Sequence, residues 1–196
     1  MNPLPFSGAP AYAWIFWSAY ACWAVLEMLW SRTKRSSDRS RDRGSLRLVI
    51  VLLWVGLGLD FWLSFALPQA AITWKRPAVF FAGIGLMLGG VAFRYYAVAT
   101  LGRFFTFDVA VQSGQKVIEA GPYRYIRHPA YTGTLTTLLG LGLALGNWVG
   151  LVALLAPIGA ALAYRIRVEE TALLEAIGEP YRQYMGRTKR LVPFLF

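Results

Sequence analysis

Long apolar stretches separated by short polar connections dominate the pattern of this 196-residue chain. A stretch of about 20 apolar residues can cross a lipid bilayer as a helix. The pattern therefore predicts an all-α polytopic membrane protein, a single membrane domain with about five transmembrane helices. The expected spans cover residues 11–30, 46–67, 78–99, 132–145 and 149–166.

The last two spans come from one apolar stretch, residues 132–166, which is too long for a single crossing. The tripeptide at 146–148 interrupts this stretch and predicts the turn of a helical hairpin. Pro157 lies in the second arm, where it predicts a kink or a closely packed neighbour. Beyond the membrane we expect helix over residues 165–177, ending at Gly178.

Small and polar residues inside the spans suggest how the helices meet. The third span holds four glycines that allow close packing, namely Gly83, Gly85, Gly89 and Gly90. Gly85 and Gly89 form a small-xxx-small pair, which favours helix packing over ligand binding. Asp60, deep in the second span, is either a hydrogen-bond partner between helices or part of a substrate pocket. Glu27 either faces the bundle or, as we favour, reaches the membrane interface.

Composition agrees with a membrane protein. Hydrophobic residues make up 57% of the chain and charged residues 15%, against about 25% charged in soluble domains. The net charge of +10 comes from basic residues that flank the spans, so we expect contact with anionic lipids and no nucleic-acid partner. One cysteine and one histidine argue against a disulfide within the chain and against a transition-metal site.

Charge also predicts the topology. Residues 32–47 contain seven basic residues, which places this loop in the cytoplasm by the positive-inside rule. Five spans that start outside put residues 100–131 and the tail from residue 165 on the same side. Residues 1–10 carry no positive charge, so we expect the first span to be retained rather than cleaved. The prediction is a multi-pass protein with its active site facing the cytoplasm.

Two polar clusters on that side carry the candidate chemistry, one at residues 121–133 and one at residues 165–170. Arg165 and Glu169 are four residues apart and share a helix face, as an interfacial ion pair or as part of a site. Arg165 could bind a carboxylate in a bidentate way, and Glu169 could accept hydrogen bonds from an ammonium group or a ribose. His128 is either a general base or, as we favour, a hydrogen-bonding ligand contact.

Aromatic rings and an extended segment complete this candidate site. The faces of Tyr123, Tyr131 and Tyr181 could attract a cation such as a sulfonium. Residues 104–111 predict a short extended or strand-like piece that ends in a turn, within a loop long enough to be functional. The expected binding region therefore covers about residues 104–131 together with residues 165–193.

The motifs in this region resemble the isoprenylcysteine carboxyl methyltransferase family, and phospholipid methyltransferases share much of the pattern. The resemblance covers roughly residues 112–193, whereas the first spans match only as generic hydrophobic helices. The motifs are Gly121-Pro122-Tyr123, Arg127-His128-Pro129-x-Tyr131-x-Gly133, Arg165-x-x-x-Glu169-Glu170 and Gly178-Glu179-x-Tyr181-x-x-Tyr184.

The resemblance implies S-adenosylmethionine as the cofactor, held in a cytosol-facing pocket, and a lipophilic substrate that arrives from the bilayer through a gap between spans. The implied cofactor contacts are Gln115, Lys116, Val117, Ile118, Tyr123, His128, Pro129, Ala130, Tyr131, Glu169 and Glu170. Gln115 departs from the histidine of some eukaryotic members. Arg165 and Glu169 are the implied catalytic residues, and Arg165 and Arg127 the implied substrate contacts.

The acceptor implied by the resemblance is a carboxylate, either isoprenylcysteine-like or a small lipophilic acid, with a phospholipid amine as the alternative. A membrane reductase using NADPH is a second class, because sterol reductases carry a similar Arg-His-x-x-Tyr-x-Gly stretch. Pro129 and the Glu169-Glu170 pair favour the methyltransferase. A third class is a non-enzymatic scaffold that binds anionic lipid. The pattern leaves the oligomeric state open.

Overall fold

The computed structural model describes residues 5–6, 10–33, 42, 44–109 and 114–192. Six α-helices are present, α1 (Pro10–Thr33), α2 (Ser45–Ala66), α3 (Arg76–Leu101), α4 (Pro129–Leu145), α5 (Trp148–Ile177) and α6 (Glu179–Arg187). Three 3-10 turns accompany them, η1 (Pro68–Ala70), η2 (Gly102–Phe104) and η3 (Gly121–Arg124). The described ranges contain no β-strand, so the all-α prediction is confirmed.

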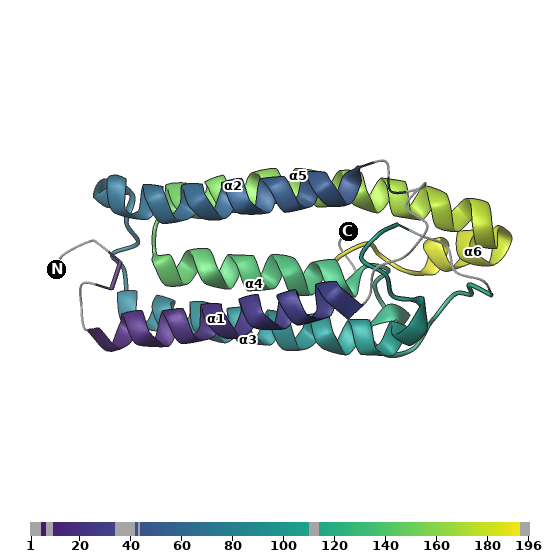
Figure 1. The fold of residues 1–196 in the computed structure, drawn as a ribbon, viewed down its shortest axis with the longest axis horizontal. Coiled ribbons are helices and arrows are strands. Elements are labelled where there is room, and N and C mark those ends of the chain that lie inside the picture. Colours follow the sequence, from purple (N-terminus) through teal and green to yellow (C-terminus); the bar gives the residue numbers. More distant parts are fainter. Residues whose placement is uncertain (1–4, 7–9, 34–41, 43, 110–113, 193–196) are drawn as a thin grey trace.

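Five long helices run along one axis, and successive helices are antiparallel (Figure 1). Helices α2 and α5 lie together on one side, α1 and α3 on the other, and α4 between them. Helix α6, η2 and η3 gather at the end of the bundle where α1, α3 and α5 finish. The bundle thus holds the later polar segments together at one end.

The five predicted spans coincide with the five long helices. By length and composition, α2, α5 and the stretch Arg76–Phe104 are long and apolar enough to cross a membrane. Helix α4 has 17 residues, fewer than the roughly 20 of a simple crossing. Helix α1 is rich in tryptophan and tyrosine, which are less apolar than leucine or isoleucine. By these criteria, three helices of the described part of the chain could cross a membrane.

The predicted hairpin between α4 and α5 is confirmed. Gly146 ends α4 in the left-handed conformation with φ of 76°, which favours glycine. The Asn147 side chain accepts a 3.0 Å hydrogen bond from the Gly150 amide and so caps α5. Helix α5 then continues through Pro157 without interruption and ends at Gly178, as predicted. One helix of 30 residues therefore links the bundle core to the polar end.

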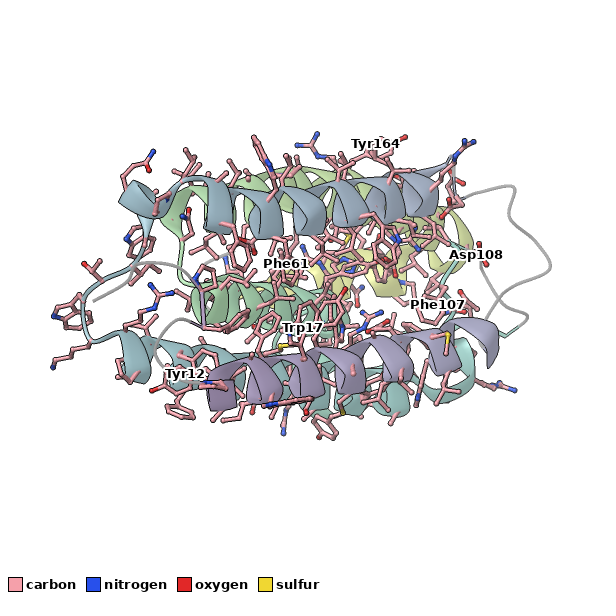
Figure 2. The ribbon with its side chains drawn as sticks, turned by 60° about the vertical axis from the view of Figure 1, so that its left-hand side comes forward. Tyr12, Trp17, Phe61, Phe107, Asp108 and Tyr164 are labelled. Atoms are coloured by element: carbon pink, nitrogen blue, oxygen red, sulfur yellow. The ribbon has the colours of Figure 1, made fainter. Side chains whose placement is uncertain are left out.

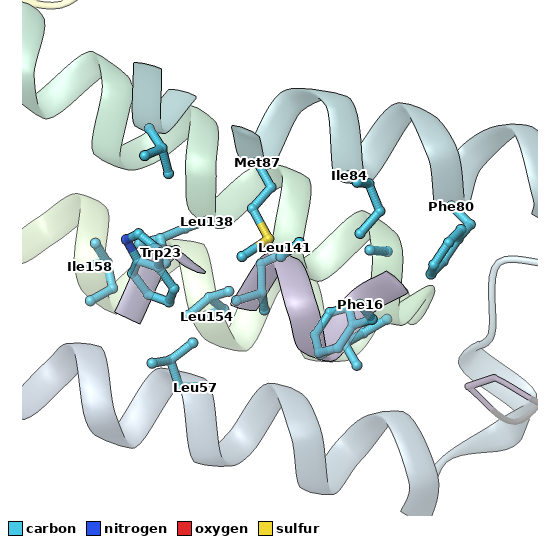
Figure 3. Close-up of a cluster of buried hydrophobic side chains, with 14 of the residues drawn as sticks. Phe16, Trp23, Leu57, Phe80, Ile84, Met87, Leu138, Leu141, Leu154 and Ile158 are labelled. Atoms are coloured by element: carbon cyan, nitrogen blue, oxygen red, sulfur yellow. The ribbon is translucent and has the colours of Figure 1, made fainter. Parts of the chain in front are cut away.

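All five long helices contribute side chains to the core. The central cluster in Figure 3 includes Phe16 and Trp23 from α1, Leu57 from α2, Ile84 and Met87 from α3, Leu138 and Leu141 from α4, and Leu154 and Ile158 from α5. The Trp17 ring stacks on Phe61 at a centroid distance of 5.5 Å, which joins α1 to α2 (Figure 2). Aromatic contacts thus add to aliphatic packing where α1 covers the bundle.

Glycines bring α3 and α4 into close contact, but they are not the predicted pair. A Cβ atom added to Gly83 would lie 2.7 Å from the Gly140 carbonyl oxygen, and one added to Gly90 would lie 2.5 Å from the Thr137 amide nitrogen. Nothing lies within 4 Å of the same position at Gly85 or Gly89. Close packing at Gly83 and Gly90 is therefore confirmed within the chain, whereas Gly85 and Gly89 lie on a helix face that does not meet α4.

Two acidic residues in the spans face the protein interior. Asp60 is fully buried, and its carboxyl group packs against Gly142 and Gly150 between α2, α4 and α5. Glu27 accepts a 2.7 Å hydrogen bond from Arg94 Nε, and this ion pair joins α1 to α3. The favoured position of Glu27 at the membrane interface was therefore wrong.

We expect Gly140→Ala to destabilise the protein, because its Cβ would lie 2.3 Å from the backbone nitrogen of Met87. Overpacking of this kind costs about 2 kcal/mol, equivalent to a fall of roughly 4 to 8 °C in Tm. Thermal unfolding in detergent would measure it. Gly89→Ala is the matched control and should not lower Tm, since its Cβ would meet open space. Equal effects of the two substitutions would contradict the assigned interface.

Candidate active site

A cavity occupies the polar end of the bundle and contains about 890 Å³ of empty space, counting the part open to solvent. Its walls come from the ends of α3 and α5, the start of α4, helix α6, the turns η2 and η3, and residues 105–109 and 115–118. Figure 2 labels Phe107 and Asp108 at this end of the molecule. Segments from both predicted clusters therefore meet around one space.

Most of the predicted site residues line this cavity. They are Gln115, Lys116, Val117, Ile118, Tyr123, Arg127, His128, Ala130, Tyr131, Arg165 and Glu169. Pro129 and Glu170 are not among the lining residues. Phe104, Phe105, Asp108 and Val109 come from the predicted extended piece, and Tyr184 from a quoted motif, whereas the sequence did not single out Leu101, Ala172, Leu173 and Ile177. Asp60 does not line the cavity either.

The segment that closes one side of the cavity is irregular. Residues 105–109 form no strand, and most of the predicted turn at 112–114 falls outside the described residues. Val109 is buried in a small cluster with Val168 and Ala172 of α5. This apolar contact fixes the segment on α5.

Backbone hydrogen bonds position the turn that carries His128. The amide of Arg127 donates to the Lys189 carbonyl at 2.8 Å, and the amide of His128 donates to the Arg190 carbonyl at 3.0 Å. Pro129 occupies the first position of α4, where the absence of an amide hydrogen costs nothing. The tail segment thus holds the start of α4 in place.

Glu170 connects this turn to α5 through three cationic or polar partners. Its carboxylate accepts hydrogen bonds from Arg127 Nε at 2.9 Å and from Arg190 Nη2 at 3.0 Å. His128 Nε2 lies 3.3 Å from Glu170 Oε1. The side chains of Glu170 and Arg127 are 5% and 8% exposed, so this is a buried charge network, which reaches the cavity through Arg127 and His128.

Glu169, one residue earlier, belongs to a different network that faces the cavity. The Tyr131 hydroxyl donates to Glu169 Oε2 at 2.8 Å and accepts from Arg165 Nε at 2.9 Å. The His128 ring stacks on Tyr131 at a centroid distance of 5.5 Å. Arg165 and Glu169 therefore share a helix face, as expected, and the tyrosine hydroxyl bridges them.

Arg165 has three further acceptors. Its Nη1 donates to Asp42 Oδ1 and to Ser45 Oγ, both at 2.9 Å, and its Nη2 donates to the backbone carbonyl of Phe107. Arg165 is only 4% exposed as a residue, although its side chain reaches the cavity wall. This guanidinium therefore joins the start of α2, the irregular segment, α4 and α5.

The sequence did not identify Asp42 as part of this region. It stands three residues before Ser45, and its Oδ2 accepts a 3.1 Å hydrogen bond from the Leu46 amide, as an N-capping carboxylate does. The sequence did contain a signal for this contact, because an acidic residue shortly before a serine and an apolar run is typical of a helix start. Burial raises the pKa of Asp42, but hydrogen bonds from the Leu46 and Val109 amides and the charge of Arg165 lower it below its usual value overall.

Arg94 supports the opposite wall. Its Nη1 donates to the Ala130 carbonyl at 3.2 Å and to Thr134 Oγ1 at 3.0 Å, while its Nε pairs with Glu27. Three helices, α1, α3 and α4, are joined in this way. The first turn of α4, which supplies Ala130 and Tyr131 to the cavity, is thereby fixed.

The tyrosines of the cavity present neutral aromatic rings. Tyr123 and Tyr181 are 6% and 4% exposed. Burial, reinforced by the negative charge of Glu169, raises the pKa of both hydroxyl groups above the usual value. Neutral, electron-rich ring faces beside a carboxylate suit a cationic ligand. Among the described residues, no group of three or more His, Cys, Asp or Glu side chains could hold a metal ion.

Comparison with known proteins gives a consistent result. Residues 83–175 match the family model described as the isoprenylcysteine carboxyl methyltransferase (ICMT) family. This region includes the end of α3, the irregular segment, the His128 turn, α4 and most of α5. The match thus covers much of the cavity wall.

Several curated relatives bear the corresponding name. A probable protein-S-isoprenylcysteine O-methyltransferase of Oryza sativa subsp. indica is 31% identical over 119 residues, which are 60% of this chain and 62% of that protein. Protein-S-isoprenylcysteine O-methyltransferase B of Arabidopsis thaliana is 30% identical over 115 residues, 58% of each chain. The Schizosaccharomyces pombe enzyme is 28% identical over 116 residues, 58% of this chain and 49% of its own length.

The match therefore spans about half to three fifths of the length of these relatives. The matched region contains most of the residues that line the cavity, whereas α6 with Tyr181 and Tyr184 lies beyond it. Residues 83–175 of this chain are thus similar to the isoprenylcysteine carboxyl methyltransferase family.

Proposed function

We propose that this protein is an integral-membrane methyltransferase that uses S-adenosylmethionine to methylate a lipophilic carboxylate at the cytoplasmic membrane face. The observation that carries the proposal is the single cavity in which Tyr123, His128, Tyr131, Arg165 and Glu169 meet. The similarity of residues 83–175 to the isoprenylcysteine carboxyl methyltransferase family supports the reaction type. The further assumption is that all five long helices cross the membrane, with α1 and α4 completing the three that qualify by length and composition.

The lining of the cavity fits the proposed cofactor in chemistry, because it combines carboxylate, guanidinium and aromatic groups. Glu169 could accept hydrogen bonds from ribose hydroxyls or from the ammonium group, and its side chain is 30% exposed. The rings of Tyr123 and Tyr181 could face the cationic sulfur. Gln115 to Ile118 would close the site from the side of the connecting segment.

When bound, S-adenosylmethionine would supply a methyl group on a sulfonium centre. The chain's own contribution is alignment and electrostatics, because a carboxylate is already a nucleophile and needs no general base. Arg165 would orient the acceptor carboxylate through charge-assisted hydrogen bonds. Tyr131 would hold Arg165 and Glu169 at a fixed separation through its hydroxyl. His128 would support Tyr131 through ring stacking.

The proposed cytoplasmic orientation rests on charge. Residues 32–47 and the tail from residue 165 are rich in basic residues. The end of α1, the start of α2 and the described tail, residues 165–192, lie at the end of the bundle that holds the cavity. The lipophilic acceptor would reach the cavity from the bilayer, with its polar end toward Arg165. Anionic lipid headgroups would surround this end.

An amine acceptor is the second candidate. Two carboxylates, Asp108 and Glu169, line the cavity, and together they would favour a cationic or neutral headgroup over an anionic one. A phospholipid amine has this chemistry. The partners of Arg165 bear on the choice between an acidic and an amine acceptor.

We expect Glu169→Gln to weaken S-adenosylmethionine binding by about 10-fold to 100-fold, the usual effect of losing a charged hydrogen-bond acceptor. Calorimetric titration of detergent-purified protein would measure it, with NADPH titrated in parallel. Glu179→Gln is the matched control, because Glu179 is exposed on α6 and makes a 3.8 Å surface contact with Arg182. Binding of NADPH but not of S-adenosylmethionine to folded wild type would overturn the proposed function.

We expect Glu170→Gln to act on stability instead. The substitution would leave the buried Arg127 side chain without its carboxylate partner, at a cost of about 3 kcal/mol. That cost corresponds to a fall of roughly 6 to 12 °C in Tm. Glu169→Gln should leave Tm within about 2 °C, since Glu169 is partly exposed. Equal losses of Tm at these neighbouring positions would contradict the separation of the two networks.

A further inference from the structure

The partners of Arg165 leave little room for a second carboxylate. A guanidinium carries five N–H donors. In the described part of the chain, four acceptors engage Arg165, namely the Tyr131 hydroxyl, Asp42 Oδ1, Ser45 Oγ and the Phe107 carbonyl oxygen. Bidentate binding of an acceptor carboxylate needs two N–H groups. One of the present partners must therefore give way.

Charge identifies the partner that gives way. Asp42 is the one carboxylate among the four acceptors, and Arg165 is its cationic partner at 2.9 Å. Glu169 already lies on the other side of the Tyr131 hydroxyl. A substrate carboxylate added here would place three negative charges around one guanidinium. Like charges at such separations repel strongly in a buried environment. The repulsion between Asp42 and the acceptor carboxylate is removed when Asp42 releases the guanidinium.

Asp42 can release Arg165 without becoming an unsatisfied buried charge. Its Oδ1 also accepts hydrogen bonds from the Val109 amide at 3.2 Å and from Ser45 Oγ at 3.1 Å. Its Oδ2 accepts from the Leu46 amide at 3.1 Å. Three neutral donors therefore remain when the contact with Arg165 is lost. The ion pair with Arg165 can therefore break while the hydrogen bond from the Leu46 amide to Asp42 stays in place at the start of α2.

We propose that Asp42 is an internal competitor of the acceptor, a carboxylate that holds the place on Arg165 which the carboxylate of the acceptor takes during turnover. The inference rests on the proposed methylation of a lipophilic carboxylate. Asp42 does not line the cavity, whereas Arg165 does, so the guanidinium must leave Asp42 and turn toward the cavity to bind the acceptor. Asp42 is in this sense a specificity-determining residue, because it weakens the binding of carboxylates that make few other contacts.

The test is the steady-state kinetics of Asp42→Asn with N-acetyl-S-farnesylcysteine as the carboxylate acceptor. Asparagine keeps an oxygen for the α2 cap but removes the competing charge. We expect KM for the acceptor to fall at least about fivefold, in line with removal of one nearby like charge, while the Kd of S-adenosylmethionine stays unchanged. Binding of the corresponding carboxamide, measured as a competitive inhibitor, should change less than twofold.

Glu119→Gln is the matched control, because Glu119 is an exposed carboxylate paired with Arg187 at the surface. It should leave KM within twofold. Asp42→Ser, which retains a capping hydroxyl, serves as the second neutral variant if Asp42→Asn does not fold. An unchanged or raised KM in a folded neutral variant would overturn the inference.

The outcomes also separate the inference from the proposed function. Wild type that neither binds S-adenosylmethionine nor methylates the farnesylated probe would overturn the proposed function. Wild type that methylates the probe, with no gain in the Asp42 variants, would overturn the inference alone. Wild type that binds the cofactor but methylates phosphatidylethanolamine in place of the farnesylated acid would also overturn it, and would assign Asp42 to a site for amines.

Discussion

Burial of the Arg165 guanidinium is the constraint on which the arrangement of the site depends. A charged group with 4% exposure must find acceptors within the protein, and here they come from the start of α2, the irregular segment, α4 and α5. The hydrogen bonds draw four segments that are distant in sequence to one point at the end of the bundle. The cavity is the space that these segments leave between them and α6.

The neighbouring residues Glu169 and Glu170 show how one helix serves two purposes. They project from adjoining faces of α5, so one reaches the cavity and the other reaches the Arg127 and Arg190 side chains behind it. The charge that could contact a ligand is thereby separated from the charge that holds the wall. The two adjacent glutamates therefore have different surroundings, Glu169 at the cavity and Glu170 in the buried network of Arg127.

Helix periodicity made much of this predictable. The five long helices and the Gly146 turn follow from apolar length and local turn chemistry, whereas many of the cavity residues were implied by the family resemblance of the motifs. The sequence could not predict that Gly83, rather than Gly85, contacts α4, because this choice depends on how α3 is rotated about its axis against α4. Asp42 was missed because it contacts a residue 123 positions away, and no local pattern encodes such a pairing.

The backbone pairing of Lys189 and Arg190 with the His128 turn has a consequence for how the protein assembles during synthesis. The five long helices precede these residues in the chain, so they are synthesised before the turn can be held in place. The part of the cavity wall that contains His128 is therefore completed only when the tail has been made.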